Sequence, residues 1–177
     1  MITISRESAE RICAVLNEES NLKNNENPVF EVPDGSIRFE NVKFRYSETA
    51  DKFVLEGINV EIKSGETVGI IGGTGSSKST FVQMIPRLYD VTEGSVSVGG
   101  IDVRDYDLET LRDSVAMVLQ KNVLFSGTVR ENLLWGNENA TQEEIEHACD
   151  LAQASPFINE MSEKFNSNID NFINEGT

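Results

Sequence analysis

Two stretches of the chain alternate apolar and polar residues with a period of two, which is typical of half-buried β-strands. They run from Ser36 to Tyr46 and from Val54 to Ile62. We interpret them as neighbouring strands that pair antiparallel. Further along, residues 94–103 hold two strand-like pieces on either side of Gly99-Gly100. Two glycines between such pieces predict a β-hairpin.

Two other runs are apolar without alternation, as in strands that are buried on both faces. The first is Thr67 to Ile71, and the second is Ala116 to Leu119, which ends at the polar Gln120. Apolar positions at helical spacing follow the first run: Phe81, Val82, Ile85 and Leu88. We expect a helix there, bent at Pro86 because proline cannot donate to the carbonyl four residues back.

Capping signals predict three further helices. Asp107 can cap a short helix that runs through Ser114. Residues 128–131 and 141–144 both fit the capping-box pattern, so helices should begin near residues 129 and 142. The apolar side of the later helix should be buried: Ile145, Ala148, Cys149 and Ala152.

The two ends of the chain carry weaker patterns. Residues 5–18 predict an amphipathic helix, and the polar stretch from Asn21 to Pro33 indicates a linker. Residues 155–177 are polar and weakly periodic, so we expect loose helix and loop there. Cys13 and Cys149 lie on the apolar sides of predicted helices without paired spacing, so we interpret them as small core residues.

The most specific signal is the loop between the first apolar run and the helix that follows. It consists of Gly72, Gly73, Thr74, Gly75, Ser76, Ser77, Lys78, Ser79 and Thr80. Glycines let successive N–H groups converge on an anion, and the helix N-terminus adds its dipole. Lys78 would reach the β- and γ-phosphates of a nucleotide, and the Ser79 hydroxyl would bind Mg²⁺. The alternative is a Gly/Ser-rich turn with a chance lysine.

One residue of this loop departs from the strict pattern G-x-x-x-x-G-K-[ST]. Ser77 stands before Lys78, where the pattern has glycine. If this position needs a positive φ, Ser77 carries a strain of roughly 1–2 kcal/mol. The departure therefore bears on the affinity for nucleotide more than on the identity of the loop.

Composition limits the class of protein and its partners. The chain has 177 residues, 38% of them apolar and 25% charged, which suits one α/β domain with appendages. No apolar run is long enough to span a bilayer. The formal net charge of −15 argues against nucleic acid or an anionic membrane surface as a direct partner. Residues 137–177 hold nine acidic side chains and one basic one, which we interpret as a solvated helix face.

In this order and spacing, the elements resemble the nucleotide-binding domain of an exporter-type ABC transporter. Phe44-Arg45-Tyr46 is similar to the aromatic loop of the family, and residues 72–80 to its Walker A loop. Residues 119–132 resemble the exporter Q-loop region, and residues 8–12 the segment that joins the last membrane helix to this domain. The resemblance implies a partial α/β P-loop NTPase core with an antiparallel β subdomain and part of the helical subdomain.

The resemblance also implies ATP and Mg²⁺ as ligands. Tyr46 would stack on adenine, which is worth roughly 1–3 kcal/mol by analogy with nucleic-acid stacking. Gln120 would contact Mg²⁺ or the attacking water, so Ser79 and Gln120 are the candidate metal ligands. Each residue has a plainer alternative: Tyr46 could pack at a strand edge, and Gln120 could satisfy a backbone group.

Parts of the family's catalytic apparatus are not found after Gln120. Hydrolysis needs a carboxylate for the hydrated metal and a group that positions water, but no apolar strand that ends in Asp-Glu follows. A Leu-Ser-Gly-Gly-Gln signature is also missing, and His147, which we expect to face solvent, is misplaced for the switch histidine. Residues 174–177 resemble the stretch just before the signature. We therefore expect a fragment whose uncovered apolar faces make it marginally stable or oligomeric.

These observations lead to an expected organisation. Residues 1–35 would link a membrane domain to residues 36–177, a partial nucleotide-binding domain on the cytoplasmic side of the membrane. The partners would be the transmembrane domain of the same transporter and a second nucleotide-binding domain. The chain would bind nucleotide weakly and not hydrolyse it, and whether it is an enzyme stays open. The alternatives are a non-catalytic piece that contacts the transmembrane domain, and a P-loop kinase, which the lack of arginine in residues 137–177 disfavours.

Overall fold

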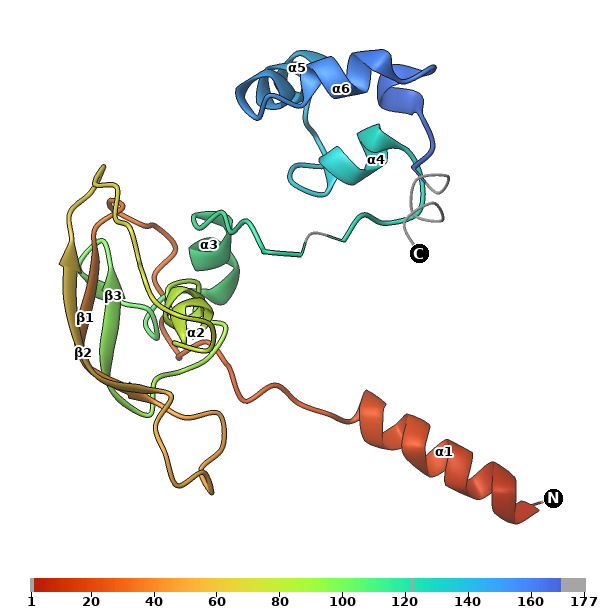
Figure 1. Ribbon diagram of the computed structural model, residues 1–177. Helices are drawn as coiled ribbons and strands as arrows, with labels where there is room; N and C mark the ends of the chain where they lie inside the picture. Colours follow the sequence, from red (N-terminus) through yellow and green to blue (C-terminus); the bar gives the residue numbers. More distant parts are fainter. Residues whose placement is uncertain (1, 122, 170–177) are drawn as a thin grey trace. The chain divides into compact units, whose positions relative to one another are not determined.

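The computed structural model describes residues 2–121 and 123–169. These residues form two compact units, Met1–Met117 and Val118–Thr177, which we describe one at a time (Figure 1). None of the helices in the described ranges combines the length and the apolar character that a membrane span requires. The stretch 174–177, which resembles a segment of the family, lies outside the described residues.

The first unit is built on a four-stranded antiparallel sheet with the order β2-β1-β3-β4. Its strands are β1 (Ile37–Phe44), β2 (Leu55–Ile62), β3 (Glu93–Val98) and β4 (Ile101–Asp102). The pairing of β1 with β2 confirms the expected antiparallel pair, and β3 with β4 confirms the hairpin. The hairpin turn needs glycine because Gly99 and Gly100 have φ angles of 57° and 79°.

Two short helices cover one face of this sheet, α2 (Lys78–Gln83) and α3 (Leu108–Asp113) (Figure 1). Phe39 of β1 stacks on Phe81 of α2 with the ring centroids 4.2 Å apart. Asp107 accepts a hydrogen bond from the Thr110 N–H at 3.0 Å, which confirms the predicted cap of α3. The core of the unit therefore lies between the sheet and the helices that the sequence pattern predicts.

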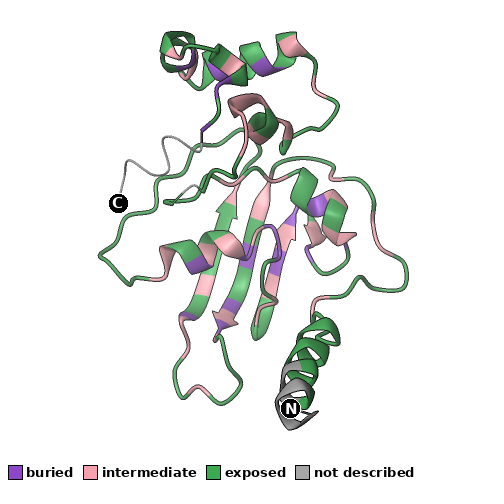
Figure 2. Ribbon diagram, turned by 90° about the vertical axis from the view of Figure 1, so that its right-hand side faces the viewer, coloured by how far each residue is buried: buried purple, intermediate pink, exposed green. Residues whose placement is uncertain are grey.

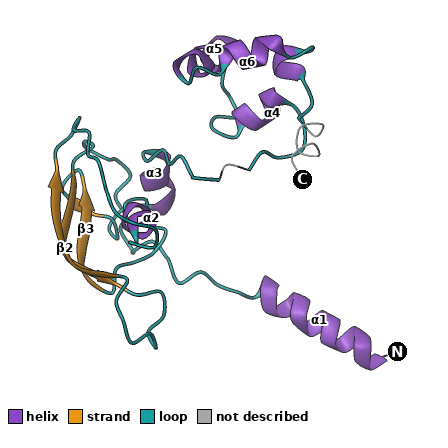
Figure 3. Cartoon of the chain, viewed as in Figure 1, coloured by secondary structure: helices purple, strands orange, loops and turns teal. Residues whose placement is uncertain are grey.

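The two apolar runs that we expected to be buried strands form no strand. Residues 67–71 and 116–119 are irregular (Figure 3). Ile71 is 99% exposed and Val118 is 89% exposed. A parallel strand needs a hydrogen-bonded neighbour that arrives through a long crossover connection. Within the described residues, no strand pairs with either run, so neither becomes part of a sheet.

The helix after the loop also differs from the expectation. It ends at Gln83, so Pro86 lies beyond it and does not bend it. The residue before a proline avoids the α region, which favours a helix end at this point. Arg87 follows with φ 50° and binds the Asp90 carboxylate through two hydrogen bonds of 2.7 and 3.1 Å.

The N-terminal helix and the expected linker have different surroundings. Helix α1 (Ile2–Leu16) confirms a helix here, and its residues 9–16 are all exposed (Figure 2). The prediction that Cys13 is a core residue was therefore wrong, because no described side chain covers that face. The polar segment that follows is fixed to the domain where the Asn24 amide donates to the Asp107 carboxylate.

The second unit consists of short helices with a small core. These are α4 (Val129–Leu134), α5 (Gln142–Leu151), α6 (Ser155–Glu160) and a 3₁₀ helix (Lys164–Asn166). Both capping boxes are formed as predicted, by Thr128 with Glu131 and by Thr141 with Glu144. The helices therefore begin at the residues that the capping signals indicate.

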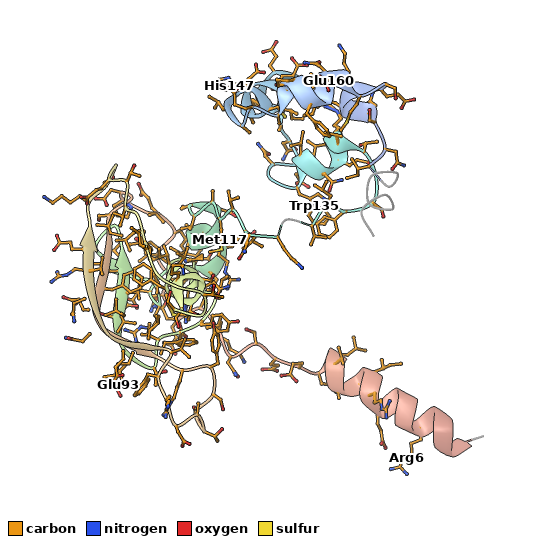
Figure 4. The ribbon with its side chains drawn as sticks, viewed as in Figure 1. Arg6, Glu93, Met117, Trp135, His147 and Glu160 are labelled. Carbon is orange, nitrogen blue, oxygen red and sulfur yellow. The ribbon has the colours of Figure 1, made fainter. Side chains whose placement is uncertain are left out.

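The buried face of α5 is narrower than expected. Ile145 and Cys149 are buried together with Ile158 of α6, whereas Ala148 and Ala152 are exposed. Val129 and Leu134 of α4 also pack against this small core, which does not extend to Ala148 and Ala152. His147, on the opposite side, is exposed as expected (Figure 4).

Candidate nucleotide-binding site

The glycine-rich loop is closed over itself by Lys78, the first residue of α2. The Lys78 ammonium donates to the carbonyl oxygens of Gly72 at 2.7 Å and Gly73 at 2.8 Å. It also contacts the Ser76 hydroxyl at 3.0 Å. A phosphate oxygen would offer this ammonium an acceptor that carries a negative charge, which the neutral carbonyls of Gly72 and Gly73 do not. The loop therefore holds its cation where an anion could replace the carbonyls.

Two backbone positions give the loop its curvature. Gly75 has φ 80° and Ser77 has φ 61° with ψ 21°. The structure thus places Ser77 in the left-handed region that glycine adopts freely, and a serine there costs about 1–2 kcal/mol. At Gly72, a β-carbon would lie 2.5 Å from the Ser76 Oγ, so only glycine fits without movement of Ser76.

Tyr46 lies beside the helix that the loop leads into. Its hydroxyl shares a hydrogen bond of 2.8 Å with the Thr80 Oγ1. The ring meets Phe44 and Tyr89 edge to face, with centroid distances of 4.9 and 5.2 Å. The Tyr46 side chain is nevertheless 55% exposed. The structure therefore brings the predicted base-binding residue and the predicted phosphate loop together in one unit.

Ser79 fits the oxygen chemistry of Mg²⁺. Its side chain is exposed and makes no hydrogen bond to another described residue. Mg²⁺ prefers oxygen ligands and is commonly held by few protein groups together with substrate phosphates. Among the described residues, no cluster of three His, Cys, Asp or Glu side chains could hold a metal alone. The Ser79 hydroxyl therefore fits a Mg²⁺ ion that binds together with a nucleotide.

The sequence profile of the ABC transporter family matches residues 55–171. The chain belongs to the ABC transporter family. Multidrug resistance protein pgp-1 of Caenorhabditis elegans is 41% identical over 133 residues, which cover 75% of this chain and 10% of the relative. ATP-binding cassette sub-family B member 5 of Mus musculus is 37% identical over 167 residues, 93% of this chain and 13% of the relative.

A solved ABC exporter has the same fold. The structure of a bacterial Atm1-family ABC exporter with ATP bound matches with a TM-score of 0.85 and 27% identity, over 95% of this chain and 29% of that chain. The predicted α/β fold of an exporter-type nucleotide-binding domain is thereby confirmed. The chain spans less than a third of the length of each of these three proteins.

The structure does not place Gln120 with the rest of the candidate site. Gln120 is exposed and belongs to the second unit, whereas Tyr46 and the loop belong to the first. Its contact with Mg²⁺ or water therefore stays a prediction. Tyr89, in contrast, touches Tyr46 although no sequence pattern marked it, because it lies in an irregular segment after α2.

The charges around the loop favour an anionic ligand. In the described part of the chain, no carboxylate forms an ion pair with Lys78. The positive charge of Lys78 is therefore not neutralised by a carboxylate, and a phosphate group could neutralise it. The candidate site therefore has a cation over a glycine-rich loop, an exposed hydroxyl and a half-exposed aromatic ring.

Proposed function

We propose that this chain is the ATP-binding portion of the motor domain of an ABC exporter. Residues 72–80 would bind the phosphates and Tyr46 would stack on the adenine. The observation that carries this proposal is the Lys78 ammonium held over the loop by the carbonyls of Gly72 and Gly73. That arrangement presents a positive charge at the centre of a curved backbone, which suits a phosphate group.

Magnesium would enter with the nucleotide. The Ser79 hydroxyl and the Gln120 side-chain oxygen would hold it, and the metal would neutralise charge on the β- and γ-phosphates. Lys78 would neutralise charge on the same phosphates from the protein side. In the whole transporter, ATP binding would bring this domain against a second nucleotide-binding domain and so drive the transmembrane domain.

We further propose that the 177-residue chain binds Mg-ATP weakly and does not hydrolyse it appreciably. Hydrolysis needs a carboxylate for the hydrated metal and a group that positions water, and no apolar strand that ends in Asp-Glu follows Gln120 in this sequence. The strain at Ser77 also opposes a tight complex.

The test is a titration of the chain with a fluorescent ATP analogue, with and without Mg²⁺. Lys78→Ala removes charge-assisted hydrogen bonds of about 1.5–3 kcal/mol, so the affinity should fall roughly 10- to 100-fold. The matched control is Lys63→Ala, because Lys63 is exposed and lies outside the loop. Equal affinities for both variants would contradict the binding proposal. Phosphate release that Lys78→Ala abolishes would contradict the absence of hydrolysis.

A second candidate function is a contact surface for the transmembrane domain, and one feature of the second unit favours it. Phe125 and Trp135 stack with ring centroids 4.8 Å apart, yet they are 54% and 74% exposed. Val123 and Leu124 beside them are exposed as well. Contiguous exposed apolar side chains of this kind mark interaction sites. Because neither aromatic side chain is buried, we propose an interface role for both.

Co-purification with the detergent-solubilised membrane domain of the parent transporter tests this second candidate. Phe125→Ala together with Trp135→Ala should abolish co-purification, whereas Lys78→Ala should leave it unchanged. Leu151→Ala is the control, since Leu151 is 73% exposed elsewhere in the second unit. Co-purification that survives the double substitution would exclude this surface.

A further inference from the structure

The Tyr46 ring is restrained from three directions by residues of its own unit. Its hydroxyl is tied to the Thr80 Oγ1 at 2.8 Å. Phe44 and Tyr89 meet the ring at interplanar angles of 81° and 84°. Tyr89 also lies 5.5 Å from Phe44, so the three rings contact one another. Edge-to-face pairs of this geometry attract beyond their buried area.

These restraints leave much of Tyr46 accessible. Phe44 is only 4% exposed, whereas Tyr46 is 55% and Tyr89 is 40% exposed. The buried Phe44 ring supports the other two rings, and Tyr46 keeps an exposed surface on which a planar nucleotide base could stack. A side chain that is already fixed loses little rotamer freedom when a ligand binds, so fixation raises affinity without adding a contact.

The restraints come from the segment that also carries the phosphate loop. Thr80 lies in α2, two residues after Lys78, and Tyr89 lies in the irregular stretch that follows this helix. Tyr46, in contrast, follows β1 in a separate part of the sequence. The contacts therefore join the predicted base-binding ring to the element that holds the predicted phosphate-binding cation.

We infer that Thr80 and Tyr89 are positioning residues that fix Tyr46 in one orientation before a nucleotide base stacks on it. The inference rests on the proposed function, because it concerns the base-binding half of that site. Thr80 acts through the hydroxyl of Tyr46 and Tyr89 acts through its ring. The part of their effect that passes through Tyr46 should weaken ligands that have a base and leave ligands of phosphates alone unchanged, so the test substitutes Tyr46 and Tyr89 and leaves Thr80, a residue of the loop 72–80, in place.

The experiment compares Mg²⁺-dependent binding of ATP and of inorganic tripolyphosphate to the same variants. Tyr89→Leu keeps an apolar side chain but removes the aromatic contact, and ATP affinity should fall about 2- to 10-fold. Tripolyphosphate affinity should not change. Tyr89→Phe, the matched control, keeps the ring and should bind both ligands like the wild type. Tyr46→Phe keeps the stacking ring and loses the bond to Thr80, so it should also weaken ATP selectively.

The outcomes separate this inference from the proposed function. Unchanged affinities for both ATP and tripolyphosphate in Tyr89→Leu and in Tyr46→Phe overturn the inference alone, provided that Lys78→Ala still weakens both ligands. Equal weakening of both ligands in these variants also overturns it, because it indicates general structural damage. If Lys78→Ala changes neither affinity, the proposed function fails and the inference fails with it.

Discussion

The antiparallel sheet and the apolar run 67–71 have similar residues but opposite surroundings. Phe39 of β1 is 2% exposed and Val96 of β3 is 1% exposed, whereas Ile71 is 99% exposed. Apolar and β-branched residues are abundant in both regions, so composition does not separate them. The difference is that β1 has hydrogen-bonded strands on both sides. Strand propensity therefore produces a strand only where a partner is supplied.

The distance along the chain to the partner explains which pairings the sequence pattern could predict, although β1 also pairs with the remote β3, where Ile37 lies opposite Val98. β3 and β4 are joined by the two-residue turn Gly99-Gly100, so their pairing closes a very short loop. A buried parallel strand requires partners from distant parts of a sequence. Closing short loops costs less conformational entropy than closing long ones. Local signals therefore predict the hairpin of β3 and β4, whereas the pairing of β1 with β3 and the lack of a partner for residues 67–71 within the described residues are decided by the tertiary structure.

The largest predicted effect concerns the packed antiparallel sheet. Phe39→Ala removes a buried ring that stacks on Phe81, so the free energy of unfolding should fall by about 3–5 kcal/mol. Ile71→Ala should change it by less than about 0.5 kcal/mol, because the side chain is exposed. Urea unfolding followed by far-UV circular dichroism measures both. Equal losses would mean that residues 67–71 are packed in solution.

The next prediction concerns the exposed apolar residues of the runs 67–71 and 116–119. The chain should self-associate as its concentration rises, because burial of an apolar side chain is worth about 1.5–3 kcal/mol. Ile71→Lys with Val118→Lys should weaken association at least tenfold, as measured by sedimentation velocity. Val15→Lys with Leu16→Lys, at residues that are each 77% exposed in α1, should leave association unchanged. A dilute monomer with a cooperative thermal transition would contradict the prediction.

Two glycines of the sheet have a positive φ but different surroundings. At Gly94 in β3, with φ 84°, a β-carbon would overlap the carbonyl oxygens of Glu40 and Asn41. At Gly57 in β2, with φ 63°, a β-carbon meets open space. Gly57→Ala should therefore cost only the backbone strain, about 1–2 kcal/mol, and Gly94→Ala should cost more. Thermal unfolding of the two variants gives the order, and the reverse order would contradict the close pairing of β1 and β3.

A substitution at Ser77 tests whether backbone strain lowers the stability of the glycine-rich loop, which follows the exposed run 67–71. Ser77→Gly removes the cost of a left-handed serine, so the free energy of unfolding should rise by up to about 1 kcal/mol. ATP affinity should stay equal or rise. Ser162→Gly, at an exposed position without a positive φ, should instead lower stability by about 0.4–1 kcal/mol. A destabilising Ser77→Gly would show that the serine side chain has a role of its own.

The smallest effect concerns the capping boxes of the second unit. The backbone N–H of Thr128 holds the pKa of Glu131 below its ordinary value of 4.5, and Thr141 does the same for the pKa of Glu144. A lowered pKa in the folded state means stability that is present above pH 4.5 and lost as the pH falls through the folded-state value. Glu131→Gln with Glu144→Gln should therefore reduce the loss of helical signal between pH 5 and pH 3. An identical acid transition in both proteins would contradict the prediction.

Local signals predicted much of the fold. The strand pair 36–62, the hairpin at Gly99-Gly100 and the caps at Thr128 and Thr141 all form as expected. Each depends on residues that are close in sequence, so pattern and turn chemistry are sufficient. The helix after the loop was predicted too long, because the restriction that Pro86 places on the preceding residue prevailed over the apolar spacing.

The candidate site was likewise only partly predictable from the sequence. The sequence by itself determined the glycine-rich loop and its lysine, since these depend on adjacent residues, whereas the positive φ of Ser77 came from the structure. Only the tertiary structure decided that Tyr46 meets Thr80 and Tyr89, and that residues 67–71 stay unpaired. Backbone geometry and capping are local interactions, whereas ring packing and strand pairing depend on which distant segments come together.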